Sequence, residues 1–259
     1  MTDQAPGGMF IWFDLTTSDS QRAKDFYAGL FGWTYTEADR GEHGFYRMVS
    51  AGDRGIGGLV TMAELGMPDD DVPPHFMPYM FTNRVDGVTA RAVELGATVY
   101  APPRDIPDTV RFSVVGDPTE APFAPMQPLM GDGPPSGDPP LGSVLWYEHT
   151  SSKPNDIASF YAELFGYSVS TMEMEFGAYR MLNVGETPVA GISPEDPGIP
   201  FAGWTIYVRV ANIDESLSLA TSLGGEPLTP AIDVPETGRT ALVKDPTGAV
   251  VGLIEPSWL

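Results

Sequence analysis

Hydrophobic and polar residues recur along the chain with two periods, a period of two that is typical of strands and a period near 3.6 that is typical of helices. The period of two predicts a strand at 9–15, and the period near 3.6 predicts an N-capped helix at 18–32 that ends at a glycine. Short strands then follow at 33–37, 45–50 and 56–62. The same order restarts with a strand at 77–83, a helix at 85–96, and strands near 98–101, 110–115 and 121–126. A unit of strand, helix and three strands therefore occurs twice in this part of the chain.

The whole pattern is repeated once more. FYAGLFGWTY at 26–35 returns as FYAELFGYSV at 160–169, with six identical residues at an offset of 134 positions. The match continues between YRMVSAGDRGIGGL (46–59) and YRMLNVGETPVAGI (179–192), and between VGDPTEA (115–121) and VKDPTGA (243–249). The chain therefore consists of two halves and four units, and the repeated aromatic residues of the helices are expected in the core.

A segment rich in glycine and proline separates the halves. GDGPPSGDPP at 131–140 has Gly or Pro at seven of ten positions, so neither a helix nor a central strand can form there. We expect a first half at 1–130, a linker at 131–140 and a second half at 141–259.

Three motifs carry a family resemblance: W-x-[DE]-L on the first strand, FY-x-x-[LV]-FG[WY] closing the first helix, and DP-T before the last strand. Together with the element order, they resemble the vicinal oxygen chelate superfamily, which contains glyoxalases, bleomycin-resistance proteins and extradiol dioxygenases. Within it, the chain is similar to two-module bacterial proteins labelled glyoxalase-like or hydroxylase. The resemblance implies an α+β fold of tandem βαβββ repeats, in which four units form two incompletely closed eight-stranded barrels, each around a cavity.

Composition narrows the range of partners. The chain has 14 Lys and Arg against 35 Asp and Glu, a formal charge of −21, which disfavours nucleic acid and anionic membrane surfaces. The acidity favours a cationic ligand, although solubility alone also accounts for it. There is no cysteine, and MTDQAPGG at the N-terminus lacks the features of a signal peptide. We expect a cytoplasmic protein, monomeric or homodimeric, with a small-molecule ligand or substrate.

The resemblance also identifies six positions at which metalloenzymes of the superfamily hold their metal. The helix starts and the DPT turns serve as reference points for locating them. They fall on Trp12, Met77 and Ala124 in the first half, and on Trp146, Thr205 and Gly252 in the second. None of these side chains binds a divalent cation well. We therefore expect no metal and no other cofactor.

A shift of two residues would instead turn Asp14 and His75 into the first cavity, because residues two apart on a strand share a face. No third ligand accompanies them. In the second half, Glu255 is expected on the face opposite Gly252.

Aromatic and apolar side chains are expected to line both cavities, with one carboxylate in each, Asp14 or Glu148. A carboxylate among aromatic rings suits a general base or acid, and a purely structural hydrogen-bond acceptor is the alternative. His75 and Tyr79 are the candidate partners in proton transfer. Besides the six metal positions, the predicted ligand-binding residues include Phe81, Tyr207, Arg47 and Arg180.

The arginines of the repeated YRM, Arg47 and Arg180, have two interpretations. They close ion pairs with residues such as Asp14 or Glu148, or they bind an anionic ligand in a bidentate way. The same holds for Arg111 and Arg239 beside Asp105 and Asp233.

Three functions remain open at this point. The first is a protein that binds a hydrophobic or aromatic small molecule without the usual metal of the superfamily. The second is a metal-free enzyme of the glyoxalase-like lyase, isomerase or hydroxylase type, in which a cavity carboxylate acts as general base. The third is a metal-dependent lyase or dioxygenase, which needs ligands that the six positions do not supply.

Overall fold

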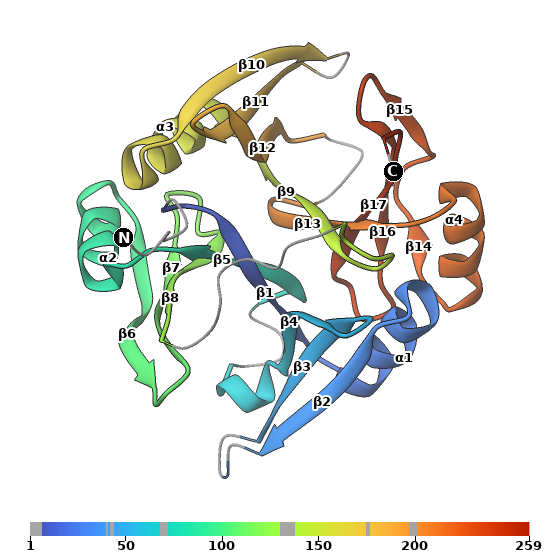
Figure 1. Cartoon of the computed structure of the whole chain (residues 1–259), viewed down its shortest axis with the longest axis horizontal. Coiled ribbons are helices and arrows are strands. Elements are labelled where there is room, and N and C mark those ends of the chain that lie inside the picture. The colour runs from blue at the N-terminus through green and yellow to red at the C-terminus, as the bar shows by residue number, and fades with distance from the viewer. Residues whose placement is uncertain are drawn as a thin grey trace. The chain divides into compact units, whose positions relative to one another are not determined.

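The computed structural model describes residues 7–39, 41, 44–67, 72–129, 138–174, 177–196 and 201–258 (Figure 1). Residues 131–137 of the expected linker lie outside this part of the chain.

The elements of the first half follow the predicted order. They are β1 (Phe10–Thr17), α1 (Ser20–Phe31), β2 (Thr34–Asp39), β3 (Phe45–Ala51), β4 (Arg54–Thr61), the 3-10 turn η2 (Ala63–Leu65), β5 (His75–Phe81), α2 (Val85–Glu94), β6 (Thr98–Ile106), β7 (Val110–Gly116) and β8 (Pro122–Pro128). Strand β5 begins two residues earlier than predicted, at His75, and η2 was not predicted.

The second half repeats this order with one addition. Its elements are β9 (Val144–Ser151), α3 (Pro154–Phe165), β10 (Ser168–Met174), β11 (Gly177–Val184), β12 (Thr187–Pro194), β13 (Gly203–Arg209), α4 (Ile213–Ser222), β14 (Glu226–Pro227), β15 (Ile232–Val234), β16 (Gly238–Lys244) and β17 (Val250–Pro256). Two short strands, β14 and β15, both pair with β16, where the first half has the single long strand β6.

Each half forms one open mixed sheet. The first has the order β2-β3-β4-β1-β5-β8-β7-β6, and the second has the main path β10-β11-β12-β9-β13-β17-β16-β14 with β15 beside β16. The family fold is thus confirmed, with nine rather than eight strands in the second sheet. In both halves the first strand pairs in parallel with the fourth, which aligns Asp14 with Gly58 and Glu148 with Gly191.

The repeated FYA-x-LFG stretch builds the same helix end twice. Asp19 caps α1 by accepting hydrogen bonds from the amides of Gln21 and Arg22, and Gly32 ends the helix at φ 70°. Gly166 ends α3 in the same left-handed conformation, at φ 78°, which glycine adopts without steric cost. The aromatic residues of both helices are buried as the repeat predicted, except Phe165, which is half-buried.

The chain folds into two compact units that each combine segments from both halves. The first comprises 1–12, 77–136 and 147–204, and the second comprises 13–76, 137–146 and 205–259. Helices α2 and α3 contact each other in the first unit, and α1 and α4 do so in the second (Figure 1).

A buried aspartate of each DPT turn joins a segment of one half to a segment of the other half within its unit. In the second unit, the hydroxyl of Tyr27 on α1 donates to Asp245 Oδ2 at 2.9 Å. In the first unit, Tyr161 on α3 donates to Asp117 Oδ2 at 3.1 Å, and His149 Nε2 donates to the same oxygen at 2.8 Å. The indole N–H of Trp204 in turn donates to the Tyr161 hydroxyl at 2.9 Å. The repeated Tyr and Asp are therefore packing partners across the halves.

These hydrogen bonds favour the ionised form of the Asp117 carboxylate. Burial alone would raise its pKa, but the hydrogen bond from His149 and those from Thr119 outweigh burial and lower the pKa overall. Burial and the facing carboxylate raise the pKa of Tyr161, so its phenol keeps its proton. His149 is fully buried, and within the described residues its Nδ1 has no hydrogen-bond partner.

Candidate functional site

Strand β5 separates core residues from predicted site residues by simple alternation. Phe76 lies on the helix side, where its ring meets those of Phe13 and Tyr27 at 5.7 and 6.0 Å between centroids. Met77 and Tyr79 lie on the other face and form a cluster with Phe112 and Ala124. The half-buried Trp12 packs against this cluster. Sequence reasoning named Trp12 and every member of the cluster except Phe112.

The end of β5 also makes backbone contacts outside the cluster. Phe81 is half-buried, and its backbone accepts a hydrogen bond from the amide of Gly8 and donates one to the carbonyl of Met9. Phe81 therefore holds the start of the described chain against the sheet, which the alternation alone did not indicate.

The second half has the same alternation on β13. Trp204 faces the core beside Tyr161, whereas Thr205 and Tyr207 lie on the opposite face. Tyr207 pairs with Gly252 across the parallel strands β13 and β17. A Cβ atom added at Gly252 would overlap the Tyr207 ring, so the ring lies directly over this glycine.

The residues at the six family positions do not fit a resident divalent cation. They supply indole, thioether, methyl and hydroxyl groups in place of imidazole and carboxylate ligands. The Tyr207 ring also covers Gly252, the third family position of the second half. Glu255, the nearest acid to that position, accepts a hydrogen bond from the amide of Ile213 at the start of α4. Among the described residues, no three of His, Asp and Glu are grouped so that they could hold a metal.

The two candidate carboxylates each accept a hydrogen bond from a repeated tyrosine. Tyr46 donates to Asp14 Oδ1 and Tyr179 donates to Glu148 Oε2, both at 2.8 Å. Asp14 is buried, whereas Glu148 and both tyrosines are half-buried.

A glycine beside each carboxylate makes room for the tyrosine. Gly58 is the strand neighbour of Asp14, and Gly191 is that of Glu148. A Cβ atom at either position would overlap the tyrosine hydroxyl. Sequence reasoning missed Tyr46 and Tyr179, although the Tyr of YRM and the glycine twelve positions later are both kept in the two halves.

His75 begins β5 and is half-buried. Its Nδ1 lies 2.9 Å from the carbonyl oxygen of Pro73, and because a carbonyl only accepts, Nδ1 carries the proton. Burial lowers the pKa of His75 in spite of this hydrogen bond, so the neutral imidazole is favoured. The neutral ring leaves Nε2 as the basic nitrogen.

The four arginines are held mainly by polar groups other than the candidate carboxylates Asp14 and Glu148. Arg47 forms a bidentate pair with Glu64 and lies 3.5 Å from Glu37. Arg180 donates to the side chain of Asn155 and to the carbonyl of Ala178. The expected pairing of Arg111 with Asp105 is present at 2.8 Å, with Asp86 as a second partner, whereas Arg239 binds Asp214 at 2.7 Å and lies 3.7 Å from Asp233. Asp14 and Glu148 are not the carboxylate partners of Arg47 and Arg180 in these interactions.

The pair of Arg47 and Glu64 predicts a stability that depends on pH. Burial alone would raise the pKa of Glu64, but hydrogen bonds from Arg47 and from the amides of Thr61 and Phe45 lower it to about 2. A depressed carboxylate pKa stabilises the fold above about pH 4.5, and this stabilisation is lost as the pH falls towards 2. Glu64→Gln should therefore lower the free energy of unfolding by up to roughly 3 kcal/mol at pH 7.

Urea unfolding at pH 7, 4 and 3 would measure this difference. The gap between wild type and Glu64→Gln should narrow as the pH falls. The control is Glu94→Gln, because Glu94 is 65% exposed in its pair with Arg91. Its effect should stay below about 1 kcal/mol. A gap for Glu64→Gln that does not change with pH would contradict the assignment.

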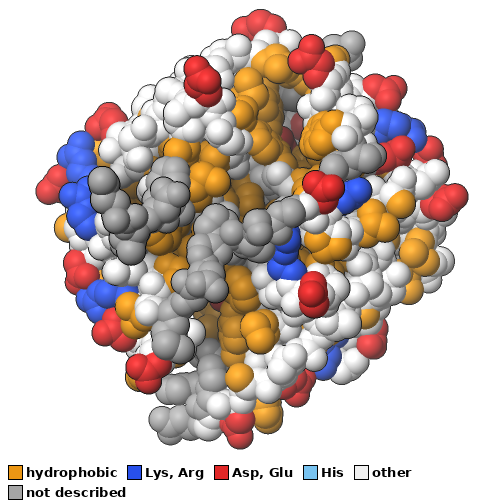
Figure 2. Space-filling model, viewed as in Figure 1, with side chains coloured by type: hydrophobic (Ala, Val, Ile, Leu, Met, Phe, Trp, Pro, Cys, Tyr) orange, Lys and Arg blue, Asp and Glu red, His pale blue; other side chains and the backbone are white. Residues whose placement is uncertain are grey.

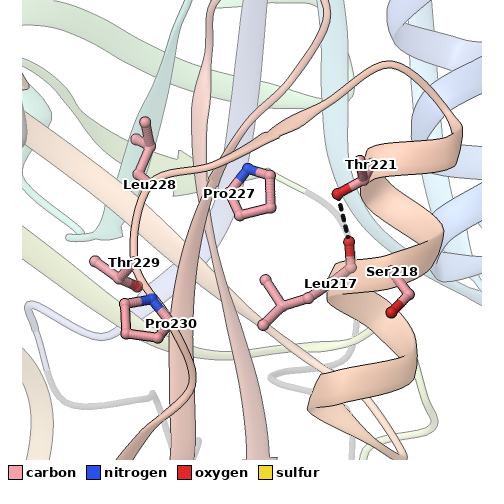
Figure 3. A pocket seen from close by; sticks show the side chains of 7 residues that line it. All are labelled: Leu217, Ser218, Thr221, Pro227, Leu228, Thr229 and Pro230. Carbon is pink, nitrogen blue, oxygen red and sulfur yellow. Dashed lines mark hydrogen bonds between the residues drawn. The ribbon is translucent and has the colours of Figure 1, made fainter.

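Other surface features offer less chemistry. A shallow hollow of about 430 Å³ lies between Leu217 and Thr221 on α4 and the segment Pro227–Pro230 (Figure 3). Its lining has no ionisable side chain, and the Thr221 hydroxyl already donates to the carbonyl of Leu217.

Acidic side chains are scattered over the face shown in Figure 2 rather than gathered in one patch, which fits a general solubilising role. In the described part of the chain, no helix is both long and apolar enough to span a membrane.

The fold is shared with metalloenzymes of known structure. The Mn(II)-bound glyoxalase of Novosphingobium aromaticivorans has a TM-score of 0.68 at 13% identity, and the alignment covers 96% of this chain and 82% of that one. The 2,2′,3-trihydroxybiphenyl 1,2-dioxygenase of Sphingomonas wittichii has a TM-score of 0.66 at 10% identity, with 96% and 90% covered. At these identities the likeness extends to the fold alone.

Sequence comparison gives nearer relatives. The Mycobacterium tuberculosis protein named "Putative glyoxylase CFP32" is 32% identical over 249 residues, which cover 95% of this chain and 94% of the relative. The anthracycline biosynthesis protein DnrV of Streptomyces peucetius is 29% identical, with 98% and 95% covered. Residues 10–123 match the model of the Glyoxalase/Bleomycin resistance protein/Dioxygenase superfamily. With its repeated motifs, its two sheets and these full-length relatives, the chain belongs to that superfamily.

Proposed function

We propose that this protein binds a flat, largely hydrophobic small molecule without the metal that many members of its superfamily use. The observation that carries the proposal is the cluster of Met77, Tyr79, Phe112 and Ala124 with Trp12 packed against it. Two of the six family metal positions lie in this cluster and a third is Trp12 itself. Aromatic and thioether side chains suit stacking with a ring system rather than coordination of a cation.

The tyrosine-paired carboxylates are polar groups that follow the proposed stacking tryptophans closely along β1 and β9. Asp14 lies two residues after Trp12 on β1, so the two side chains project from the same face of the strand. The hydrogen bond from Tyr46 fixes one oxygen of this carboxylate. An oriented acceptor on the same strand face as a tryptophan suits a ring system that carries a hydroxyl or ammonium group.

One of the relatives favours the same ligand class. The Streptomyces peucetius relative is named for anthracycline biosynthesis, and anthracyclines are planar ring systems that carry a cationic amino sugar. The charge of −21 on this chain is compatible with such a cation. For this chain we propose polycyclic aromatic ligands of that general chemistry, with one site in each half.

Titration with the fluorescent anthracycline daunorubicin would test the proposal. Trp12→Ala should weaken the site of the first half, and Trp146→Ala that of the second, each by about 10-fold or more through lost stacking. The matched control is Trp258→Ala, because Trp258 is 57% exposed at the end of the described chain. Equal affinity in all three variants would contradict a cavity site, and so would the absence of saturable binding to the wild type.

A metal-free enzyme is the second function that a specific observation favours, namely the tyrosine-paired Asp14 and Glu148. A carboxylate of this kind can act as a general base on a bound small molecule. Chromatography of the daunorubicin recovered after prolonged incubation separates the two functions. Unchanged ligand supports binding alone, whereas an altered product would favour the enzyme.

A further inference from the structure

The buried hydroxyl of Thr205 distinguishes the second half from the first. Thr205 is 2% exposed, and within the described chain its Oγ1 has no hydrogen-bond partner. Leaving a buried hydroxyl without a partner destabilises a protein, so most such groups are bonded. The corresponding residue of the first half is Met77, which has no hydroxyl and packs in an apolar cluster.

The neighbours of Thr205 place this hydroxyl in the proposed ligand site. Thr205 lies on β13 between β9, which carries Trp146, and β17, which carries Gly252. Tyr207 lies two residues further along the same face of β13, and its ring covers Gly252. The hydroxyl is thus a polar point on the same face of β13 as the Tyr207 ring, whereas Trp204 on the opposite face packs into the core.

We propose that Thr205 makes the second half selective for oxygenated aromatic ligands, by forming a hydrogen bond with a ring hydroxyl or carbonyl. This inference rests on the proposed binding function and adds a difference between the two halves. The thioether of Met77 suits bare ring surface, whereas a threonine hydroxyl donates to a carbonyl and either donates to or accepts from a phenol.

Removing the hydroxyl should raise the stability of the ligand-free protein and lower its selectivity for oxygenated ligands. Thr205→Val replaces the hydroxyl with a methyl group of similar size, so it removes a buried group that lacks a partner. The ligand-free variant should melt about 2 °C or more above the wild type. The matched control is Thr89→Val, since buried Thr89 donates to the carbonyl of Val85 and contacts the Ser113 hydroxyl at 2.7 Å. That variant should melt below the wild type.

Binding is measured with 2-naphthol and 2-methylnaphthalene, which differ only by a hydroxyl in place of a methyl group. The probes are titrated against Trp12→Ala protein, so that the second half dominates the signal. There, 2-naphthol should bind about 5-fold more tightly, and Thr205→Val in the same background should abolish this preference.

The outcomes separate this inference from the proposed function. If both probes bind in a saturable way but without preference, or if the preference survives Thr205→Val, the role of Thr205 is overturned and the binding function stands. If Thr205→Val melts below the wild type as Thr89→Val does, the hydroxyl has a partner in the protein and the inference fails. If neither probe binds in a saturable way, both proposals fail.

Discussion

Replacing Asp117 by alanine should lower the free energy of unfolding by about 4 kcal/mol, or roughly 10 °C in the thermal midpoint. The carboxylate is 2% exposed and accepts hydrogen bonds from His149, Tyr161 and Thr119. The variant would leave the imidazole and the phenol buried without their acceptor. Thermal unfolding followed by circular dichroism measures the effect.

Asp86→Ala is the control for Asp117→Ala. It removes a carboxylate from a bidentate pair with Arg111, but the Asp86 side chain is 69% exposed, so the loss should stay below about 1 kcal/mol. Equal melting of the two variants would show that the buried network contributes no more than a surface ion pair. Asp245→Ala should destabilise the protein less than Asp117→Ala, because the side-chain bond to Tyr27 has no imidazole beside it.

Replacing Gly58 or Gly191 by alanine should lower the affinity for an aromatic ligand by about 10-fold in the half concerned. The added methyl group would overlap the hydroxyl of Tyr46 or Tyr179, so the tyrosine must move away from its carboxylate. We also expect a loss of about 2 kcal/mol in the free energy of unfolding, as is usual for overpacking. Daunorubicin titration and urea unfolding of the same samples give both quantities.

Two further variants separate steric strain from loss of the hydrogen bond. Gly87→Ala in α2 has only the Arg84 Cβ within reach, at 3.9 Å, and should be neutral or slightly stabilising. Tyr46→Phe removes the bond to Asp14 without adding volume, and should lower affinity with a smaller loss of stability. If Gly58→Ala, Gly191→Ala and Tyr46→Phe all keep the wild-type affinity, the tyrosine-carboxylate pairs do not belong to the binding site.

The repeat made much of the fold predictable. It fixed the helix end at Gly32 and Gly166, and the alternation around Phe76 and Met77 separated the core face of β5 from the other face. In the second half, β14 and β15 were harder to predict, because two- and three-residue strands carry too little periodicity to be recognised.

The candidate site was less predictable, because its hydrogen bonds join strands that are distant in the sequence. Tyr46 and Asp14 are 32 positions apart in the sequence, and Glu64 binds Arg47 from a 3-10 turn that the sequence pattern did not predict. A pattern of residues identifies which side chains share a face, but the pairing of charges and hydroxyls depends on register between strands.

The bonds from Tyr27 to Asp245 and from Tyr161 to Asp117 are exchanged by the internal repeat, since each tyrosine and each aspartate is the counterpart of the other. Each half therefore supplies the tyrosine of one bond and the aspartate of the other, and each bond joins the first half to the second within one unit. The two copies nevertheless differ in sequence, so that Leu15 in one corresponds to the buried His149 in the other, and Met77 to Thr205. A symmetric dimer must carry every change twice, whereas two copies within one chain can differ, so one copy keeps the apolar Met77 while the other has the hydroxyl of Thr205.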